Sequence, residues 1–138
     1  MERFFNNIKF SVTDVREYSP VTLAYLGDSV YELYIRSYLL KDENLTSYSL
    51  HKKAVKYVSA KSQAVILGRI FDILDEDEKN LVRRAKNQKT FSLPKNALLE
   101  DYKQATALEA LIGYLYLKKD YERLDLILGL TVSKEENE

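Results

Sequence analysis

The stretch Leu23-Ala24-Tyr25-Leu26-Gly27-Asp28-Ser29-Val30 is the most informative part of this 138-residue chain. It is mostly apolar and predicts a buried helix. Asp28 lies within it, and a carboxylate in such a setting is costly unless it is paired, hydrogen-bonded or bound to a metal. Glu109 has a similar setting in Ala107-Leu108-Glu109-Ala110-Leu111-Ile112-Gly113. The two acids are therefore candidates for one shared site.

Each of these two segments also contains a glycine, Gly27 in the first and Gly113 in the second. Glycine inside a helix costs about 1 kcal/mol relative to alanine. The missing side chain allows two helix backbones to approach closely, which is the simplest explanation for both residues. We expect the two helices to cross near these glycines, which would bring Asp28 and Glu109 together.

Neighbouring charges along the helices do not satisfy either acid. Glu32 has Arg36 at i, i+4, which predicts an ordinary helical ion pair. Asp28 and Glu109 have no basic residue three or four positions away. Carboxylates without cationic partners suit Mg²⁺, which binds through one or two carboxylates, water and substrate phosphate. A solvated helix edge is the alternative, and spacing alone leaves both interpretations open.

The whole chain predicts a single all-helical domain. Proline and glycine are scarce, and no alternating strand pattern with Asn-Gly or Asp-Gly turns occurs, which favours helices. The predicted helices cover residues 20–40, 47–58, 60–74, 75–86, 97–118 and 120–132. Ser19, Ser59 and Asp75 are the expected N-caps, with Glu78 completing a capping box. We expect a basic loop over residues 87–96, a core over about residues 19–132 and a frayed acidic tail over 133–138.

Composition excludes several classes of protein. The hydrophobic fraction of 46% and the charged fraction of 30% are typical of a soluble globular domain. The absence of cysteine excludes disulfides and thiolate metal sites. No apolar run approaches the roughly 18 residues of a membrane helix. The N-terminus has no signal-peptide pattern, so we expect a cytoplasmic protein. The single histidine, His51, has no local signature of a nucleophilic triad.

The charges are segregated, although the 21 basic and 21 acidic residues cancel. Residues 51–69 and 79–95 carry cations and no acid. Basic faces of this kind suit an anionic partner even at zero net charge. The alternative is a solvated helix face that binds nothing.

The stretch around Asp28 resembles the signature helix of ribonuclease III catalytic domains. Residues 106–114 resemble the second acidic helix of that family, which has the pattern Asp-x-x-Glu-Ala. Several shorter segments look like the Mini-ribonuclease III branch, which lacks a double-stranded-RNA-binding domain; these are Ala24-Tyr25, His51-Lys52-Lys53, Ser59-Ala60-Lys61-Ser62-Gln63-Ala64 and Pro94-Lys95-Asn96. The resemblance covers nearly the whole chain.

The resemblance implies a ribonuclease III-like helical bundle that forms a homodimer through its signature helices. It implies an endoribonuclease that cleaves double-stranded RNA with Mg²⁺, or with Mn²⁺ as a substitute. Asp28 and Glu109 would be the catalytic, metal-binding residues, and water would be the nucleophile. Larger members carry further acids at the positions of Val21, Ala24 and Thr106. A Mg²⁺ held by two carboxylates, water and the scissile phosphate is therefore the simpler expectation.

The natural substrate implied by the resemblance is a large-subunit ribosomal RNA precursor, with a ribosomal protein as helper. Double-stranded RNA is recognised mainly through shape, 2′-hydroxyls and phosphates, which requires spaced cations and amides. The residues expected to bind RNA are His51, Lys52, Lys53, Lys61, Ser62, Gln63, Arg83, Arg84, Lys86, Asn87, Lys95 and Asn96. Two other functions stay open: an inactive RNA-binding scaffold of the same fold, suggested by the missing acids, and a helical protein-interaction module.

Overall fold

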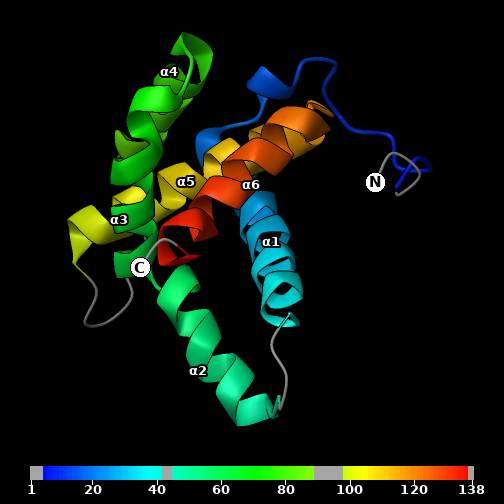
Figure 1. Ribbon diagram of the computed structural model, residues 1–138. Helices are drawn as coiled ribbons and strands as arrows, with labels where there is room; N and C mark the ends of the chain where they lie inside the picture. Colours follow the sequence, from blue (N-terminus) through cyan, green and yellow to red (C-terminus); the bar gives the residue numbers. More distant parts are fainter. Residues whose placement is uncertain (1–4, 42–44, 89–97, 137–138) are drawn as a thin grey trace.

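The computed structural model describes residues 5–41, 45–88 and 98–136, and within these ranges it contains helices and no strand. The helices are η1 (Val15–Glu17), α1 (Pro20–Leu39), α2 (Ser47–Val58), α3 (Ala60–Ile70), η2 (Phe71–Ile73), α4 (Glu76–Lys86), α5 (Leu99–Leu117) and α6 (Tyr121–Glu136). Figure 1 shows their arrangement. The prediction of an all-helical fold is confirmed.

The caps predicted from the sequence set the starts of three helices. Ser19 accepts a hydrogen bond from the Thr22 amide at the start of α1. Ser59 ends α2 and caps α3. Asp75 and Glu78 form the predicted capping box of α4. Since each side chain satisfies a backbone amide that has no partner within its helix, local sequence decides these boundaries.

Two helix ends and one short helix differ from the prediction. The helix expected over residues 60–74 ends at Ile70 and continues as the 3-10 turn η2, closed by a hydrogen bond from the Leu74 amide to the Phe71 carbonyl. The last helix continues to Glu136 instead of ending near Val132, and Thr131 and Val132 are both buried. Helix η1, with its own capping box, was not expected.

Helix α5 is the central element of the fold. It contacts α1, α3, α4, α6 and η1, and in Figure 1 its yellow ribbon passes behind the red and orange α6. Its residues from Ala105 to Leu115 are all buried except Glu109, which is half-buried. A helix that is apolar on all sides is buried in the core. Glu109 is the one residue of this segment that is not fully buried.

The packing of α1 against α5 depends on two glycines. A Cβ atom added to Gly27 would overlap with the carbonyl oxygen of Glu109, and one added to Gly113 would overlap with the carbonyl oxygen of Leu23. The two backbones therefore touch directly at the point where the helices cross. This confirms the predicted crossing.

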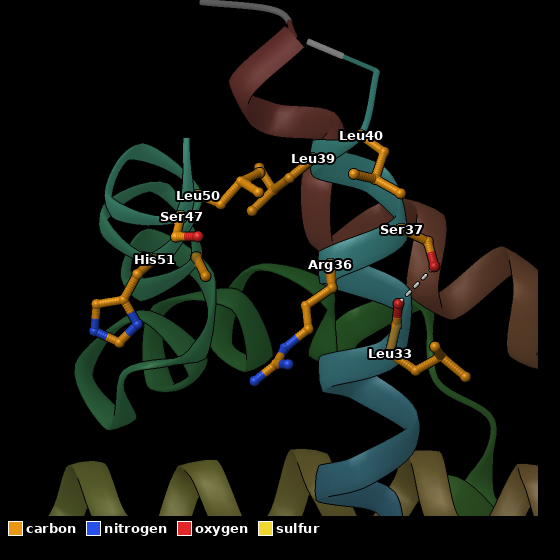
Figure 2. A pocket seen from close by; sticks show the side chains of 9 residues that line it. Leu33, Arg36, Ser37, Leu39, Leu40, Ser47, Leu50 and His51 are labelled. Carbon is orange, nitrogen blue, oxygen red and sulfur yellow. Dashed lines mark hydrogen bonds between the residues drawn. The ribbon is translucent and has the colours of Figure 1, made fainter. Parts of the chain in front are cut away.

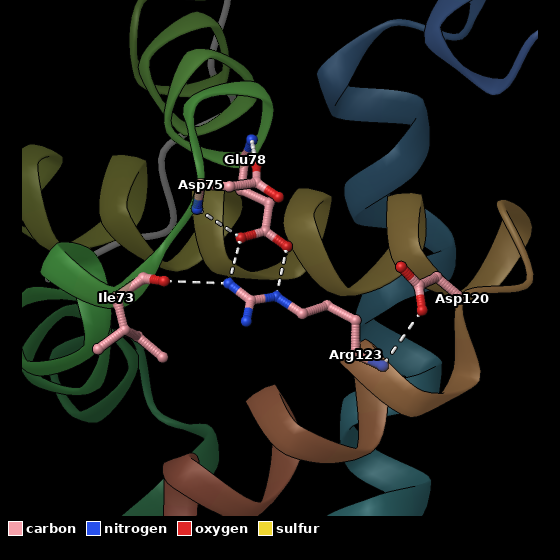
Figure 3. Close-up of polar contacts among 5 residues, drawn as sticks. All are labelled: Ile73, Asp75, Glu78, Asp120 and Arg123. Carbon is pink, nitrogen blue, oxygen red and sulfur yellow. Dashed lines mark hydrogen bonds and ion pairs between the residues drawn. The ribbon is translucent and has the colours of Figure 1, made fainter.

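A buried ion pair joins α4 to α6 on the other side of α5. Arg123 binds both carboxylate oxygens of Glu78, with Nε to Oε2 at 2.8 Å and Nη2 to Oε1 at 2.6 Å. Its Nη2 also donates to the Ile73 carbonyl, and its backbone amide donates to Asp120 (Figure 3). Glu78 is buried, so loss of Arg123 would leave an uncompensated charge, which costs about 3–5 kcal/mol in other proteins.

No helix among the described residues is both long enough and apolar enough to cross a lipid bilayer.

Gly27→Ala is expected to destabilise the fold by at least about 3 kcal/mol, because overpacking here meets the rigid backbone of α5. The matched control is Gly68→Ala on α3, where an added Cβ meets nothing within 4 Å. That variant is expected to gain about 1 kcal/mol from helix propensity. Urea unfolding measures both values. A Gly27→Ala protein as stable as the wild type would contradict the close crossing.

Candidate functional site

The crossing of α1 and α5 places Asp28 beside Glu109. Gly27, which immediately precedes Asp28, lies directly on the backbone of Glu109. The negative charge of Asp28 acts on the Glu109 carboxyl group and raises its pKa. The predicted juxtaposition of the two acids is therefore present.

Asp28 itself is exposed, so of the two interpretations that the sequence left open, the solvated edge of the helix describes its position. Helix α1 buries Leu23, Gly27 and Tyr31 against its neighbours. The next residue around the helix turns away by about 100°, which places Asp28 at the edge of the contact. It can therefore face solvent while remaining next to the half-buried Glu109.

The carboxyl group of Glu109 is held in place and electrostatically stressed. Gln63 of α3 donates a hydrogen bond from Nε2 to Glu109 Oε2 at 3.2 Å. Burial, followed by the negative charge of Asp28, raises the pKa of Glu109 from 4.5 to about 8, and Glu32 adds a smaller effect in the same direction. The hydrogen bond from Gln63 opposes this rise because it favours the ionised carboxylate.

The cations on the described part of the chain do not relieve this repulsion. Its ion pairs join Arg16 to Asp14, Arg36 to Glu32 and Arg123 to Glu78, and none of them includes Asp28 or Glu109. The Glu32–Arg36 pair confirms the predicted i, i+4 contact, although its 3.7 Å separation is loose. An excess of negative charge thus remains at the crossing.

The donor set of this site fits a hydrated magnesium ion. In the described ranges, no group of three or more His, Cys, Asp or Glu side chains is arranged to hold a metal. Two carboxylates in mutual repulsion would still gain from a divalent cation between them. Mg²⁺ keeps several waters and uses one or two protein carboxylates. Asp28 and Glu109 could supply these two ligands, which agrees with the reduced acid set of the sequence.

Most of the residues expected to bind RNA lie at the surface. His51, Lys52, Lys61, Arg83, Arg84 and Asn87 are exposed, and Lys53, Ser62 and Lys86 are partly so. Lys95 and Asn96 lie outside the described residues. The exposed members come from α2, α3 and the C-terminal end of α4, so they do not belong to one helix face.

Gln63 does not belong to this exposed set, and its assignment to the RNA surface is corrected. It is 2% exposed, and its amide also donates to the carbonyl of Val58 at 3.0 Å. The polar segment 59–64 gave no sign that one of its members points inward. Only the packing of α3 against α5 turns Gln63 toward Glu109.

A groove of about 450 Å³ lies between α1 and α2. Figure 2 shows its lining by leucines from both helices, with Arg36 and His51 at one side. The outer face of α1 is unusually apolar, since Tyr25 is 84% exposed and both Leu33 and Leu40 are 64% exposed. Asp28 lies on the exposed part of the same helix.

Comparison with known proteins gives a consistent result. The Ribonuclease III domain family matches residues 21–120. A Mini-ribonuclease 3 from Thermoanaerobacter sp. (strain X514) is 49% identical over 114 residues, which cover 83% of this chain and 80% of that protein. A Mini-ribonuclease 3 from Clostridium tetani is 37% identical over 134 residues, which cover 96% of this chain and 89% of that protein.

A crystal structure of a protein from Fusobacterium nucleatum has the same fold. The TM-score is 0.79, with 41% identity, and the match covers 90% of this chain and 99% of that one. The family match spans both acidic residues and the crossing glycines. The chain belongs to the ribonuclease III family, within the group named Mini-ribonuclease 3, and is an endoribonuclease.

Proposed function

We propose that this endoribonuclease cleaves double-stranded RNA with Mg²⁺ at the site formed by Asp28 and Glu109. The observation that carries this proposal is the pairing of two carboxylates, without a cationic partner in the described ranges, at the crossing of α1 and α5. A bound Mg²⁺ would polarise the scissile phosphate and activate water at neutral pH. Mn²⁺ is the expected substitute.

The two acids have different parts in this proposal. Asp28 is exposed and can bind the cation from the solvent side, where the RNA backbone approaches. Glu109 is half-buried and anchored by Gln63, so it provides the fixed ligand. Burial of one ligand excludes water from its side of the site and strengthens its interaction with the cation.

The exposed basic residues support binding to RNA phosphates. Lys61 lies in the first turn of α3, two residues before the Gln63 that contacts Glu109. Its side chain is exposed and therefore accessible to RNA phosphates. Lys52, Arg83 and Arg84 are further exposed cations, and His51 is an exposed polar residue on α2. Cations arranged in this way bind the backbone and not the base sequence.

We also propose a homodimer formed through the outer face of α1. Three large side chains on this face, Tyr25, Leu33 and Leu40, are mostly exposed in the single chain. Exposed apolar surface of this kind marks interaction sites. Because Asp28 lies on the same helix, a dimer formed here would hold its two acidic sites near the interface. A ribosomal RNA precursor as substrate and a ribosomal protein as helper stay predictions from the family resemblance.

The decisive experiment incubates the protein with long duplex RNA and Mg²⁺. Asp28→Asn and Glu109→Gln are each expected to lower the cleavage rate by at least about 100-fold, because a bound metal contributes several kcal/mol to phosphoryl transfer. RNA binding, measured by gel shift, should be retained. Unchanged cleavage in the variants would refute the site. Binding without cleavage by the wild type would favour an inactive scaffold, and absence of binding would favour a protein-interaction module.

The repulsion at the site predicts a pH-dependent gain in stability for Glu109→Gln. The pKa of Glu109 is about 8 in the fold and near 4.5 when unfolded. The wild type therefore loses stability as pH rises from about 4.5 to 8. In EDTA at pH 8.5 the variant is expected to melt roughly 5 °C above the wild type, with little difference at pH 4.5.

Two controls accompany this melting measurement. Glu122→Gln changes an exposed acid on α6 and should leave the melting temperature within about 1 °C, as surface substitutions usually do. Mg²⁺ or Mn²⁺ should stabilise the wild type and not Glu109→Gln. Equal melting temperatures for the wild type and Glu109→Gln at pH 8.5 would show that ionisation of Glu109 does not destabilise the fold.

RNA binding through Lys61 is tested by its salt dependence. The slope of log K against log salt is about 0.9 for each phosphate contact, so Lys61→Ala should reduce it by about one. Lys119→Asn is the control, because Lys119 is an exposed cation just beyond the C-terminal end of α5 and away from Gln63 and Glu109 in the middle of the fold. Its positive φ of 66° makes asparagine the suitable replacement. An unchanged slope in Lys61→Ala would remove this residue from the RNA surface.

A further inference from the structure

We propose that Gln63 is a positioning residue that fixes the Glu109 carboxylate for binding a divalent cation. This inference rests on the proposed function of the acidic pair. It reassigns a residue that lies beneath the surface and has no access to RNA.

The hydrogen bonds of Gln63 define one orientation of its side chain. Its amide nitrogen donates to the Val58 carbonyl at 3.0 Å and to Glu109 Oε2 at 3.2 Å. A backbone carbonyl and an ionised carboxylate only accept hydrogen bonds, so the NH₂ group and not the carbonyl of Gln63 faces them when Glu109 is ionised. Gln63 thereby uses both N–H donors to link the last residue of α2 to the middle of α5.

The position of Gln63 is set by the corner between α2 and α3. Ser59 ends α2 and caps α3, and its hydroxyl accepts from the Ser62 amide at 3.2 Å. This corner places Gln63 in the first turn and a half of α3, on the side that packs against α5. Glu109 is thus held through its Oε2 by a residue that local capping has already fixed.

The observed orientation of the Gln63 amide leaves one of its polar atoms without a hydrogen bond among the described residues, which lowers the stability of the fold. The other amide atom, Gln63 Oε1, is buried and has no hydrogen-bond partner in the described part of the protein. Leaving such an atom unsatisfied costs about 1–3 kcal/mol. An apolar side chain of the same size would avoid this cost. What glutamine adds is a donor aimed at a carboxylate that would otherwise be free to rotate.

A residue in this role affects the metal more than the fold. Residues that hydrogen-bond to metal ligands typically contribute 10–100-fold to metal affinity or activity. Gln63→Met keeps the volume and removes the donors. We therefore expect at least a 10-fold rise in the Kd for Mn²⁺, measured on the full chain without RNA by electron paramagnetic resonance. The Mg²⁺ concentration for half-maximal cleavage should rise in parallel.

The matched control is Tyr31→Phe. The Tyr31 hydroxyl donates to the Tyr57 carbonyl at 2.8 Å, so this variant also removes a buried tie to the end of α2. It leaves the bond between Gln63 and Glu109 in place. The Kd for Mn²⁺ should therefore stay within two-fold of the wild type. Melting curves in EDTA test whether both variants are folded. If Gln63→Met does not fold, Gln63→Asn replaces it, because the asparagine amide is one methylene too short to reach both acceptors.

The outcomes are separable. A selective rise in Kd for Gln63→Met or Gln63→Asn supports the positioning role. A Kd within two-fold of the wild type, or an equal loss in Tyr31→Phe, overturns it and leaves the acidic pair as the metal site. Wild-type Mn²⁺ binding that is unchanged by Glu109→Gln instead refutes the proposed function, and the role of Gln63 with it.

Discussion

Direct backbone contact between α1 and α5 is the constraint on which the rest of the structure depends. Gly27 and Gly113 have no side chain to keep the helices apart, so each backbone lies against the other. This contact brings residues that are about eighty positions apart in sequence into one site. It also explains why the central helix can be apolar on nearly all sides, since it is covered by four other α-helices.

The acidic pair at this crossing lowers the stability of the fold when Glu109 is ionised. Burial and the negative charge of Asp28 both disfavour the ionised form of Glu109, and this raises its pKa. The buried pair of Glu78 and Arg123 is the opposite case, because Arg123 satisfies the carboxylate there with two hydrogen bonds, one of which is also the ion pair. Buried Glu78 is a paired structural carboxylate, whereas half-buried Glu109 has no ion-pair partner among the described residues and belongs to the proposed metal site.

Local sequence predicted much of the fold because caps and apolar spacing act over a few residues. Ser19, Ser59 and Asp75 define helix starts wherever they occur, and α2 has the predicted bounds. The end of α3 was placed four residues too late, and that of α6 about four residues too early. Helix ends without a strong capping residue depend on what packs against them, as the buried Thr131 and Val132 show for α6.

The sequence by itself determined that Asp28 and Glu109 belong together, because their apolar settings, the glycines and the family pattern are all local features. Only the tertiary structure decided which side chains face inward. Asp28 is exposed because the helix contact passes through Gly27, and Gln63 is buried because α3 packs on α5. A polar residue has the same chemistry on either side of a helix, so its direction is fixed only by the neighbours that cover it.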